Sequence, residues 1–323
     1  MKKRIEYIDL ARGILSVLTV FRHTGLFLKL PTSVPSFIFL SALFYNTKLD
    51  FKSFLIKRLR VLIVPFIFFY ISSYLCFIIA SIIYEPIKNM TDASGIMDVF
   101  FQKQLFNGPL WFLLALFWIH LLYYPIKKFI DSILIRFILS LFLGIIGWYL
   151  GYKGFFCPLY FDSALSMMPF FFVGNQIFKL RYLDYKYLGL YLIAFFSIVA
   201  IVFCYFNLSI SAQSTYNLYG SIWEYVNTIV ILTIYSIAIL FVCKRWENKI
   251  NIVKWLGENS MLIMCTHHII YRPVQLFISH IIPDAILPII VSFITLLITI
   301  LFAPLFNKYF PWAIGKIKYE KVN

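Results

Sequence analysis

Apolar residues form long, nearly uninterrupted runs along this chain, and polar residues gather in the short stretches between them. A run of about 20 apolar residues can cross a bilayer as a helix, and a helix pairs its own backbone groups there. The pattern predicts an all-α polytopic integral membrane bundle with about ten transmembrane helices. The predicted spans lie near residues 8–29, 34–47, 61–84, 109–126, 133–150, 158–178, 187–206, 223–243, 253–272 and 285–306.

The composition agrees with a chain that lies mostly inside the membrane. Hydrophobic residues make up 62% of the 323 residues, charged residues make up 13%, and the mean hydropathy is +0.85. Soluble domains are about 45–50% apolar and about 25% charged. No linker-like or low-complexity stretch divides the sequence, so we expect one integral membrane domain over residues 1–323.

The positions of the cations explain the net charge of +15 better than a nucleic-acid partner would. Arg12 and Arg22 lie in the first span, and most other Lys and Arg residues fall on one side of the predicted bundle. Cytoplasmic segments of membrane proteins carry such an excess of cations. The pattern predicts that both termini are cytoplasmic, that the chain contacts membrane lipids and that it binds no nucleic acid. The outer segments hold only Lys29, Lys88, Lys103, Lys153 and Arg272.

The five cysteines show no spacing typical of a metal site or a redox motif. We therefore expect neither a disulfide framework nor a bound metal. The longest outer loop covers residues 85–108, and residues 96–106 within it have the pattern of an amphipathic helix at the membrane interface.

Two ionisable residues, Arg12 and His23, lie eleven residues apart in the first span. Ionisable side chains inside a membrane are costly and usually functional. At about 100° per residue, eleven residues fall within about 20° of three full turns, so both side chains lie on one helix face, about 16 Å apart along the axis. We interpret the pair as part of a site that extends through the depth of the membrane.

Four motifs, in order, resemble the acyltransferase 3 family of membrane acyltransferases. The first is an arginine, ten residues and a histidine, Arg12 and His23 here. The second is a Phe-rich run followed by a basic segment before a proline. The third is GPLWFLLALFW, and the fourth is a Gly-x-Asn-Ser sequence with a later histidine, His267. PFFFVGNQIFK adds a weaker fit. The motifs cover residues 4–23, 33–66, 108–118, 256–268 and 169–179.

The chain departs from the family pattern at two places. The family's Ser-Gly is Ser41-Ala42 here, and Lys57 stands where the family has the first arginine of Arg-x-x-Arg. Lysine keeps the charge but loses the bidentate fork of arginine. The resemblance implies an O-acyltransferase that moves an acyl group, most simply acetyl, from coenzyme A to a hydroxyl of a surface glycan or its lipid-linked precursor at a bacterial plasma membrane.

That activity assigns roles to residues of the first two motifs. His23 has a suitable pKa to take the proton of the acceptor hydroxyl as a general base. Arg12 either holds a polar part of the acyl carrier or forms a structural ion pair with Asp9. Lys57, Arg58 and Arg60, expected at the cytoplasmic mouth between spans two and three, either bind the phosphates of coenzyme A or only mark the cytoplasmic side.

Three further residues are candidates for the acceptor side. His267 either orients the acceptor, stabilises the oxyanion or packs in the core, and we expect it at a depth similar to His23. Asp162 and Glu224 begin spans that open outwards and either bind sugar hydroxyls or play no direct role. His268 and His120 are interpreted as structural.

Two other functions stay open at this point. One is a polytopic transporter or flippase with a histidine relay, although we find no internal repeat and no paired broken helices of the kind that transporters use. The other is a non-catalytic assembly partner.

Overall fold

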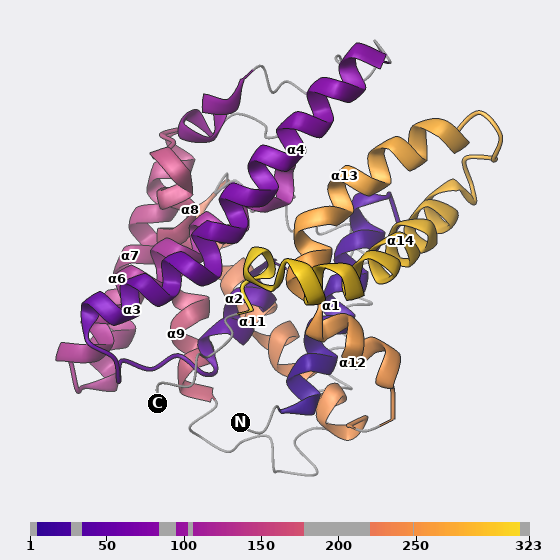
Figure 1. The fold of residues 1–323 in the computed structure, drawn as a ribbon. Coiled ribbons are helices and arrows are strands. Elements are labelled where there is room, and N and C mark those ends of the chain that lie inside the picture. The colour runs from indigo at the N-terminus through magenta and orange to yellow at the C-terminus, as the bar shows by residue number, and fades with distance from the viewer. Residues whose placement is uncertain are drawn as a thin grey trace, which may run out of the picture. The chain divides into compact units, whose positions relative to one another are not determined.

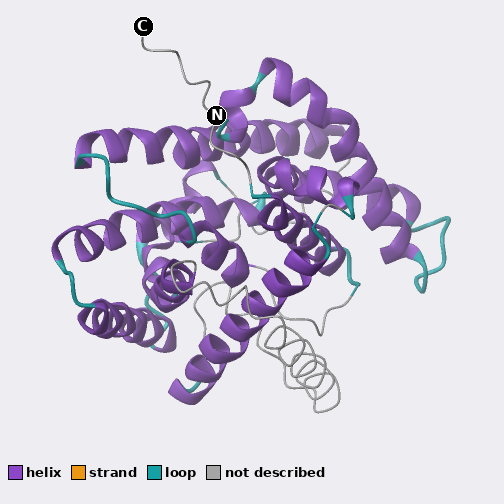
Figure 2. Ribbon diagram, turned by 90° about the horizontal axis from the view of Figure 1, so that it is seen from below, coloured by secondary structure: helices purple, strands orange, loops and turns teal. Residues whose placement is uncertain are grey.

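The computed structural model describes residues 5–26, 34–83, 95–102, 106–177, 220–247 and 249–316. Helices and their connections make up all of these ranges, and no strand occurs within them (Figure 2). The all-α prediction is therefore confirmed for the described part of the chain. The described residues divide into two compact units, each assembled from several separate stretches of sequence. The expectation of one domain over 1–323 stays a prediction.

The first unit contains the N-terminal helix and the motif residues between 125 and 260. Figure 1 labels the helices that belong to it. Its helices are α1 (Glu6–His23), α2 (Val34–Ala42), α7 (Ile133–Tyr152), α8 (Phe161–Ser166), α9 (Met168–Ile177), α11 (Ile222–Arg245) and α12 (Asn251–Glu258).

The second unit contains the basic segment, the GPLWF motif and the C-terminal helices. The last residues of α6 belong to the first unit. The elements of the second unit are α3 (Phe51–Arg58), the π-helix η1 (Leu59–Ile63), α4 (Val64–Ile83), the 3-10 helices η2 (Ile96–Phe101), η3 (Gly108–Leu110), η4 (Pro158–Tyr160) and η8 (Pro311–Ile314), and α6 (Trp111–Phe129), α13 (Ser260–Ile278) and α14 (Leu287–Tyr309).

Five described helices are long and apolar enough to cross a membrane, and each matches a predicted span. They identify the chain as a membrane protein. The count of ten spans and the position of the termini stay predictions. The five helices are Phe51–Ile82, Gly108–Phe129, Ile133–Tyr152, Ile222–Arg245 and Leu287–Tyr309.

Two predicted spans are interrupted, which the apolar pattern did not reveal. Residues 158–178 divide into η4, α8 and α9, with a break at Met167 before Pro169. Proline lacks a backbone N–H and restricts the residue before it. Residues 253–272 divide into α12 and α13 at Asn259, whose side-chain amide donates to the carbonyl of Trp255 at 2.9 Å. Such a local side-chain bond competes with the helix ladder.

Other predicted segments differ in length or lie outside the description. α2 has nine residues instead of the fourteen predicted for the second span, and all but one of them are buried. α1 ends at His23, and residues 27–33 at the end of its predicted span lie outside the described residues. The seventh span, 187–206, also lies outside them.

The first unit is held by helices that approach at backbone distance. A Cβ at Gly13 of α1 would overlap the carbonyl of Val253 in α12, and a Cβ at Gly257 of α12 would overlap the carbonyl of Asp9 in α1. Gly174 of α9 meets the backbone of Phe39 in α2 in the same way. The PFFFVGNQ and Phe-rich motifs therefore pack on each other.

The second unit is organised around two helix contacts. α13 packs on α14 through Tyr271, Leu287 and Val291. The C-terminal helix η8 packs on η1 and α4, where a Cβ at Gly315 would lie 2.8 Å from the carbonyl of Val61. Gly315 also has a φ of 68°, a conformation that glycine adopts without strain.

Candidate active site

The pair Arg12 and His23 lies on one continuous helix, because α1 runs from Glu6 to His23 without a break. The helical spacing also puts Ser16 and Thr19 on the same face, between the two ionisable residues. Both hydroxyls are buried. They donate to the carbonyls four residues earlier, Ser16 to Arg12 and Thr19 to Leu15, each at 2.8 Å. This face of α1 is thus a polar stripe, Arg12–Ser16–Thr19–His23.

Arg12 lies at the N-terminal end of this polar stripe and is two-thirds buried. Its Nη1 lies 3.5 Å from Oδ1 of Asp9, which is almost fully buried. One turn earlier on α1, Glu6 forms an ion pair of 2.9 Å with Lys254 of α12. The Glu6–Lys254 pair and the close contacts at Gly13 and Gly257 hold α1, which carries Arg12, against α12. The predicted Asp9 contact is therefore present, and the structural and functional readings of Arg12 are compatible.

His23 is the last residue of α1, and its side chain is exposed. The helix end carries the turn Thr24–Gly25, in which Gly25 has a φ of 103°. An exposed imidazole at the end of a rigid helix is accessible to a substrate while its backbone position is fixed. The first unit therefore presents the candidate base at one end of the polar stripe and a cation at the other.

A second polar cluster closes the end of α2, where the family's Ser-Gly is replaced by Ser41-Ala42. The amide of Asn175 donates to the carbonyls of Ala42 at 2.9 Å and Tyr45 at 3.1 Å. The ammonium of Lys127 donates to Tyr45 at 2.8 Å and to Oδ1 of Asn175 at 2.6 Å. Carbonyls at a helix C-terminus lack donors from the next helical turn. The side chains of Asn175 and Lys127 donate hydrogen bonds to the carbonyls at and just beyond the end of α2. Lys127 thus has a structural role beyond its contribution to the charge asymmetry.

The two acidic candidates have opposite environments. Asp162 begins α8 and is fully buried. Glu224 lies in the first turn of α11, is exposed, and its backbone N–H is capped by Ser221 at 3.2 Å. Exposure makes Glu224 the better placed of the two to meet a ligand from outside the unit.

The basic segment lies within a helix and not in the loop that the sequence suggested. Lys57 and Arg58 end α3, Arg60 lies in η1, and the helix continues into α4. The helix begins at Asp50, whose side chain accepts from the backbone N–H of Ser53 at 3.1 Å. The hydroxyl of Ser53 and, to a smaller extent, its backbone N–H lower the pKa of Asp50 by hydrogen bonding to the carboxylate. A π-turn inside a helix often marks a functional position, so this segment keeps its candidacy in a more rigid setting.

The arginines of this segment differ in exposure. Arg60 is exposed. Arg58 is half-buried, with its guanidinium carbon 4.9 Å from the ring centroid of Phe54 and its charge close enough to act on buried His120. Arg58 is therefore oriented by the protein, while Arg60 projects outwards.

His267 is fully buried in α13, and its Nδ1 lies 2.7 Å from the carbonyl of Ile263. It belongs to the second unit and His23 belongs to the first. The expectation that the two histidines share one site at similar depth stays a prediction.

Comparison with known proteins identifies the chain. Residues 5–308, nearly its whole length, match a family model described as an acyltransferase domain. The chain belongs to the acyltransferase 3 family. Searches of curated proteins and of solved structures found no match to it. The resemblance drawn from the motifs is confirmed, and the protein is a membrane acyltransferase.

Membership in the acyltransferase 3 family argues against the transporter alternative. This argument differs from the one made from the sequence, which considered internal repeats and broken helices. The sequence argument relied partly on the lack of paired broken helices; two predicted spans are interrupted, so this part of the argument separates the two functions less clearly than the sequence suggested. The family match over residues 5–308 now supports an acyltransferase.

This acyltransferase also has polar residues that the sequence reasoning missed. Asn107, just before the GPLWF motif, is fully buried and donates to Oγ of Ser73 at 2.9 Å and to the carbonyl of Cys265 at 2.8 Å. His268 was interpreted as structural, yet its side chain lines a pocket in the second unit. The only signal for this cluster in the sequence was an asparagine directly before the GPLWF motif.

None of these residues forms an obvious metal site. Within the described ranges, no group of three His, Cys, Asp or Glu side chains could hold a metal ion. The expected absence of a metal stays a prediction.

Proposed function

We propose that this membrane acyltransferase moves an acetyl or other small acyl group from acyl-CoA, supplied at the cytoplasmic side, to a hydroxyl of a surface glycan or its lipid-linked precursor. We place it in the plasma membrane of a bacterium, with both termini cytoplasmic. The orientation is supported by the uneven distribution of Lys and Arg along the sequence.

The observation that carries the proposal is the polar stripe of α1. It joins Arg12 to His23 over eleven residues of unbroken helix, which corresponds to about 16 Å. That length is comparable with an extended pantetheine arm. A thioester could therefore reach His23 while the polar part of coenzyme A stays near Arg12. The buried hydroxyls of Ser16 and Thr19 give the stripe a polar surface along the way.

His23 carries the chemical step in this proposal. Its neutral imidazole takes the proton of the acceptor hydroxyl as the oxygen attacks the thioester carbonyl. The tetrahedral intermediate collapses with loss of the thiolate of coenzyme A, which then receives the proton from the imidazolium. The products are an ester on the acceptor and free coenzyme A, and His23 returns to its neutral form.

The remaining candidates bind or position the substrates. Lys57, Arg58 and Arg60 contact the phosphates of coenzyme A, which suit arginine in particular. Glu224 contacts sugar hydroxyls. His267 orients the acceptor or stabilises the oxyanion, and Asp162, being buried, supports the site from within the first unit.

Substitution of the base tests the proposal directly. In purified protein given acetyl-CoA and a glycan acceptor, His23→Ala should lower the rate of transfer about 10²–10⁴-fold, with yield and thermal stability unchanged. His280→Ala is the matched control, because His280 is also exposed and lies outside every motif. Transfer at nearly the wild-type rate by correctly folded His23→Ala would refute the mechanism.

A further inference from the structure

The second unit contains a pocket that the proposed chemistry does not use. It lies between α4 and α13 and contains about 530 Å³ of empty space, part of which is open to the surroundings. Its walls are mainly apolar. The apolar side chains that matter here are Phe77 and Ala80 of α4, Phe106, and Pro273 and Leu276 of α13.

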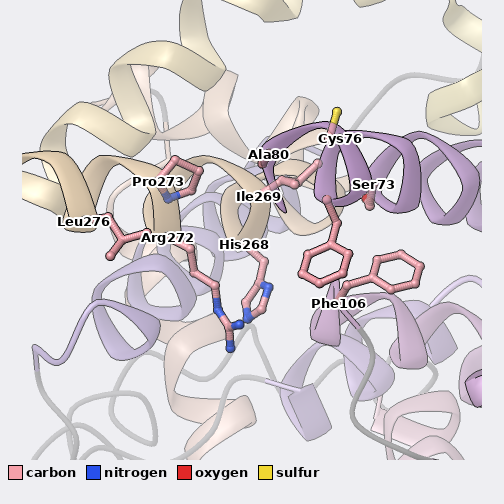
Figure 3. Close-up of a pocket in the computed structure, with 10 residues that line it drawn as sticks. Ser73, Cys76, Ala80, Phe106, His268, Ile269, Arg272, Pro273 and Leu276 are labelled. Atoms are coloured by element: carbon pink, nitrogen blue, oxygen red, sulfur yellow. The ribbon is translucent and has the colours of Figure 1, made fainter. Parts of the chain in front are cut away.

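One face of α13 brings a cation to this apolar wall. His268, Arg272 and Leu276 follow each other at intervals of four residues, so they lie on the same side of the helix. Figure 3 shows the side chains of His268 and Arg272 extending from α13 in the same direction. His268 is buried and Arg272 is half-buried. No acidic residue is among the described residues that line the pocket.

The pocket is held in shape by hydrogen bonds behind its wall. Asn107 joins α4 and α13 by donating to Ser73 and to the carbonyl of Cys265. Ser73 in turn donates to the carbonyl of Phe69. Its hydroxyl is therefore occupied within the protein and is not placed as a nucleophile. These contacts favour a preformed binding pocket over a second reaction centre.

The combination of a hydrocarbon wall and an adjacent guanidinium suits a lipid phosphate. Arginine binds phosphate with a fork of donors, and Arg272 is one of the residues that line this apolar pocket. In acyl-CoA the phosphates are separated from the acyl group by the pantetheine arm, whereas Arg272 and Leu276 are one helical turn apart.

We propose that this pocket binds the phosphate-linked lipid carrier of the acceptor glycan, with the chain along Phe77, Ala80 and Leu276 and the phosphate at Arg272. This inference rests on the proposed function and selects the lipid-linked precursor as the acceptor. The predicted topology puts Arg272 near the outer end of its span, where the headgroup of a lipid in that leaflet lies.

Native mass spectrometry of the full-length protein, titrated with three probes, tests the inference. Farnesyl phosphate joins one chain to a phosphate, farnesol lacks the phosphate, and phosphatidylglycerol represents ordinary anionic membrane lipid. We expect farnesyl phosphate to bind at least about tenfold more tightly than farnesol, because charge-assisted contacts to phosphate are strong, and to bind more tightly than phosphatidylglycerol. Equal affinity for farnesyl phosphate and phosphatidylglycerol would mean that bulk lipid occupies the pocket, which would overturn the inference.

Two pairs of variants locate the binding. Arg272→Gln should weaken farnesyl phosphate by about tenfold and leave farnesol unchanged, whereas Lys153→Gln, an equal loss of charge at an exposed position, should change neither. Ala80→Phe should weaken both probes by filling the pocket. Ile79→Phe, on the exposed side of the same helix, should not. If Arg272→Gln and Ala80→Phe both bind farnesyl phosphate as the wild type does, the pocket is not the site.

The outcome is distinguishable from that of the proposed function, because binding is measured without acyl donor. Transfer that depends on His23 in a protein that does not bind farnesyl phosphate would refute this inference alone. Specific binding through Arg272 in a protein that acylates no glycan would refute the proposed function and leave a lipid-phosphate site.

Discussion

The helices α1 and α13 both carry polar side chains on largely apolar surfaces, but these side chains have different surroundings in the two units. On α1 the backbone itself is in contact with α12 at Gly13 and Gly257, and the hydroxyls of the polar stripe are satisfied by their own helix. On α13 the polar face at His268 and Arg272 borders a pocket of about 530 Å³.

The difference assigns different tasks to the two surfaces. Close backbone packing holds the angle and rotation of α1, so the positions of Arg12 and His23 relative to each other are fixed. An open pocket beside α13 instead leaves room for something that the protein does not contain. In the first unit, backbone packing fixes the helix that carries the polar residues. In the second unit, the polar residues of α13 line a pocket.

The largest expected effect comes from filling the α1–α12 contact. Gly257→Ala puts a methyl group into the carbonyl of Asp9, and a backbone atom cannot move aside as a flexible side chain can. Overpacking costs about 1–3 kcal/mol and occasionally more, so we expect a loss of about 3 kcal/mol, measured by thermal unfolding in detergent. Gly108→Ala is the control in the second unit, because its methyl would lie 3.9 Å from Nε2 of His268, an ordinary contact. Equal stability of both variants would show that the α1–α12 contact is not tight.

Two buried asparagines sharpen the comparison at an intermediate size of effect. Asn175→Ala removes one of two donors from each of the carbonyls of Ala42 and Tyr45, which keep the backbone N–H of Tyr45 and the ammonium of Lys127, and it removes an acceptor from Lys127. Three hydrogen bonds are lost, one of them from a charged group, and a single hydrogen bond contributes about 0.5–3 kcal/mol, so we expect a loss of about 2 kcal/mol in thermal or denaturant unfolding.

Asn107→Ala is the matched variant in the second unit and should cost less, about 1 kcal/mol. Its hydrogen bonds go to the hydroxyl of Ser73 and the carbonyl of Cys265, both neutral groups, whereas Asn175 also accepts from the ammonium of Lys127. In addition, Oδ1 of Asn107 is buried without a hydrogen bond among the described residues, so truncation removes one unfavourable atom. A larger loss for Asn107→Ala than for Asn175→Ala would contradict this view of the two units.

The long apolar helices could be predicted from the sequence because a continuous apolar run has few alternatives in a membrane. Five of the predicted spans appear as single helices. The interruptions at Met167 and Asn259 were missed, since hydropathy does not record a local side-chain bond such as that of Asn259. The π-helix at Leu59–Ile63 was missed for a similar reason, because cations near the membrane are equally compatible with a loop.

The candidate site was predicted where helical spacing alone was sufficient. The interval between Arg12 and His23 requires only that α1 be continuous, which it is. That His268 lines a pocket could not be predicted, because adjacent residues on a helix point about 100° apart and only the tertiary structure shows which direction faces the pocket. Asn107 could not be interpreted because its partners, at Ser73 and Cys265, are distant in the sequence.

The smallest expected effect is a difference between Arg58 and Arg60, the two arginines of the basic segment at α3 and η1. Both are compared with Lys127 of the first unit. Lys127 is held by Tyr45 and Asn175, whereas Arg60 is exposed and Arg58 is half-buried over Phe54.

An oriented guanidinium should bind phosphate better than a mobile one. We therefore expect Arg58→Ala to raise the KM for the acyl donor about tenfold, and Arg60→Ala to raise it less than about fivefold, in line with exposed charges. The KM for the acceptor should stay constant in both variants, and Arg58→Lys should recover part of the loss because it keeps the charge without the fork. Steady-state kinetics with donor and acceptor varied separately give these values. An unchanged donor KM in Arg58→Ala and Arg60→Ala would mean that the basic helix serves only to orient the chain in the membrane, and the binding site of the donor would then have to be sought elsewhere than at η1.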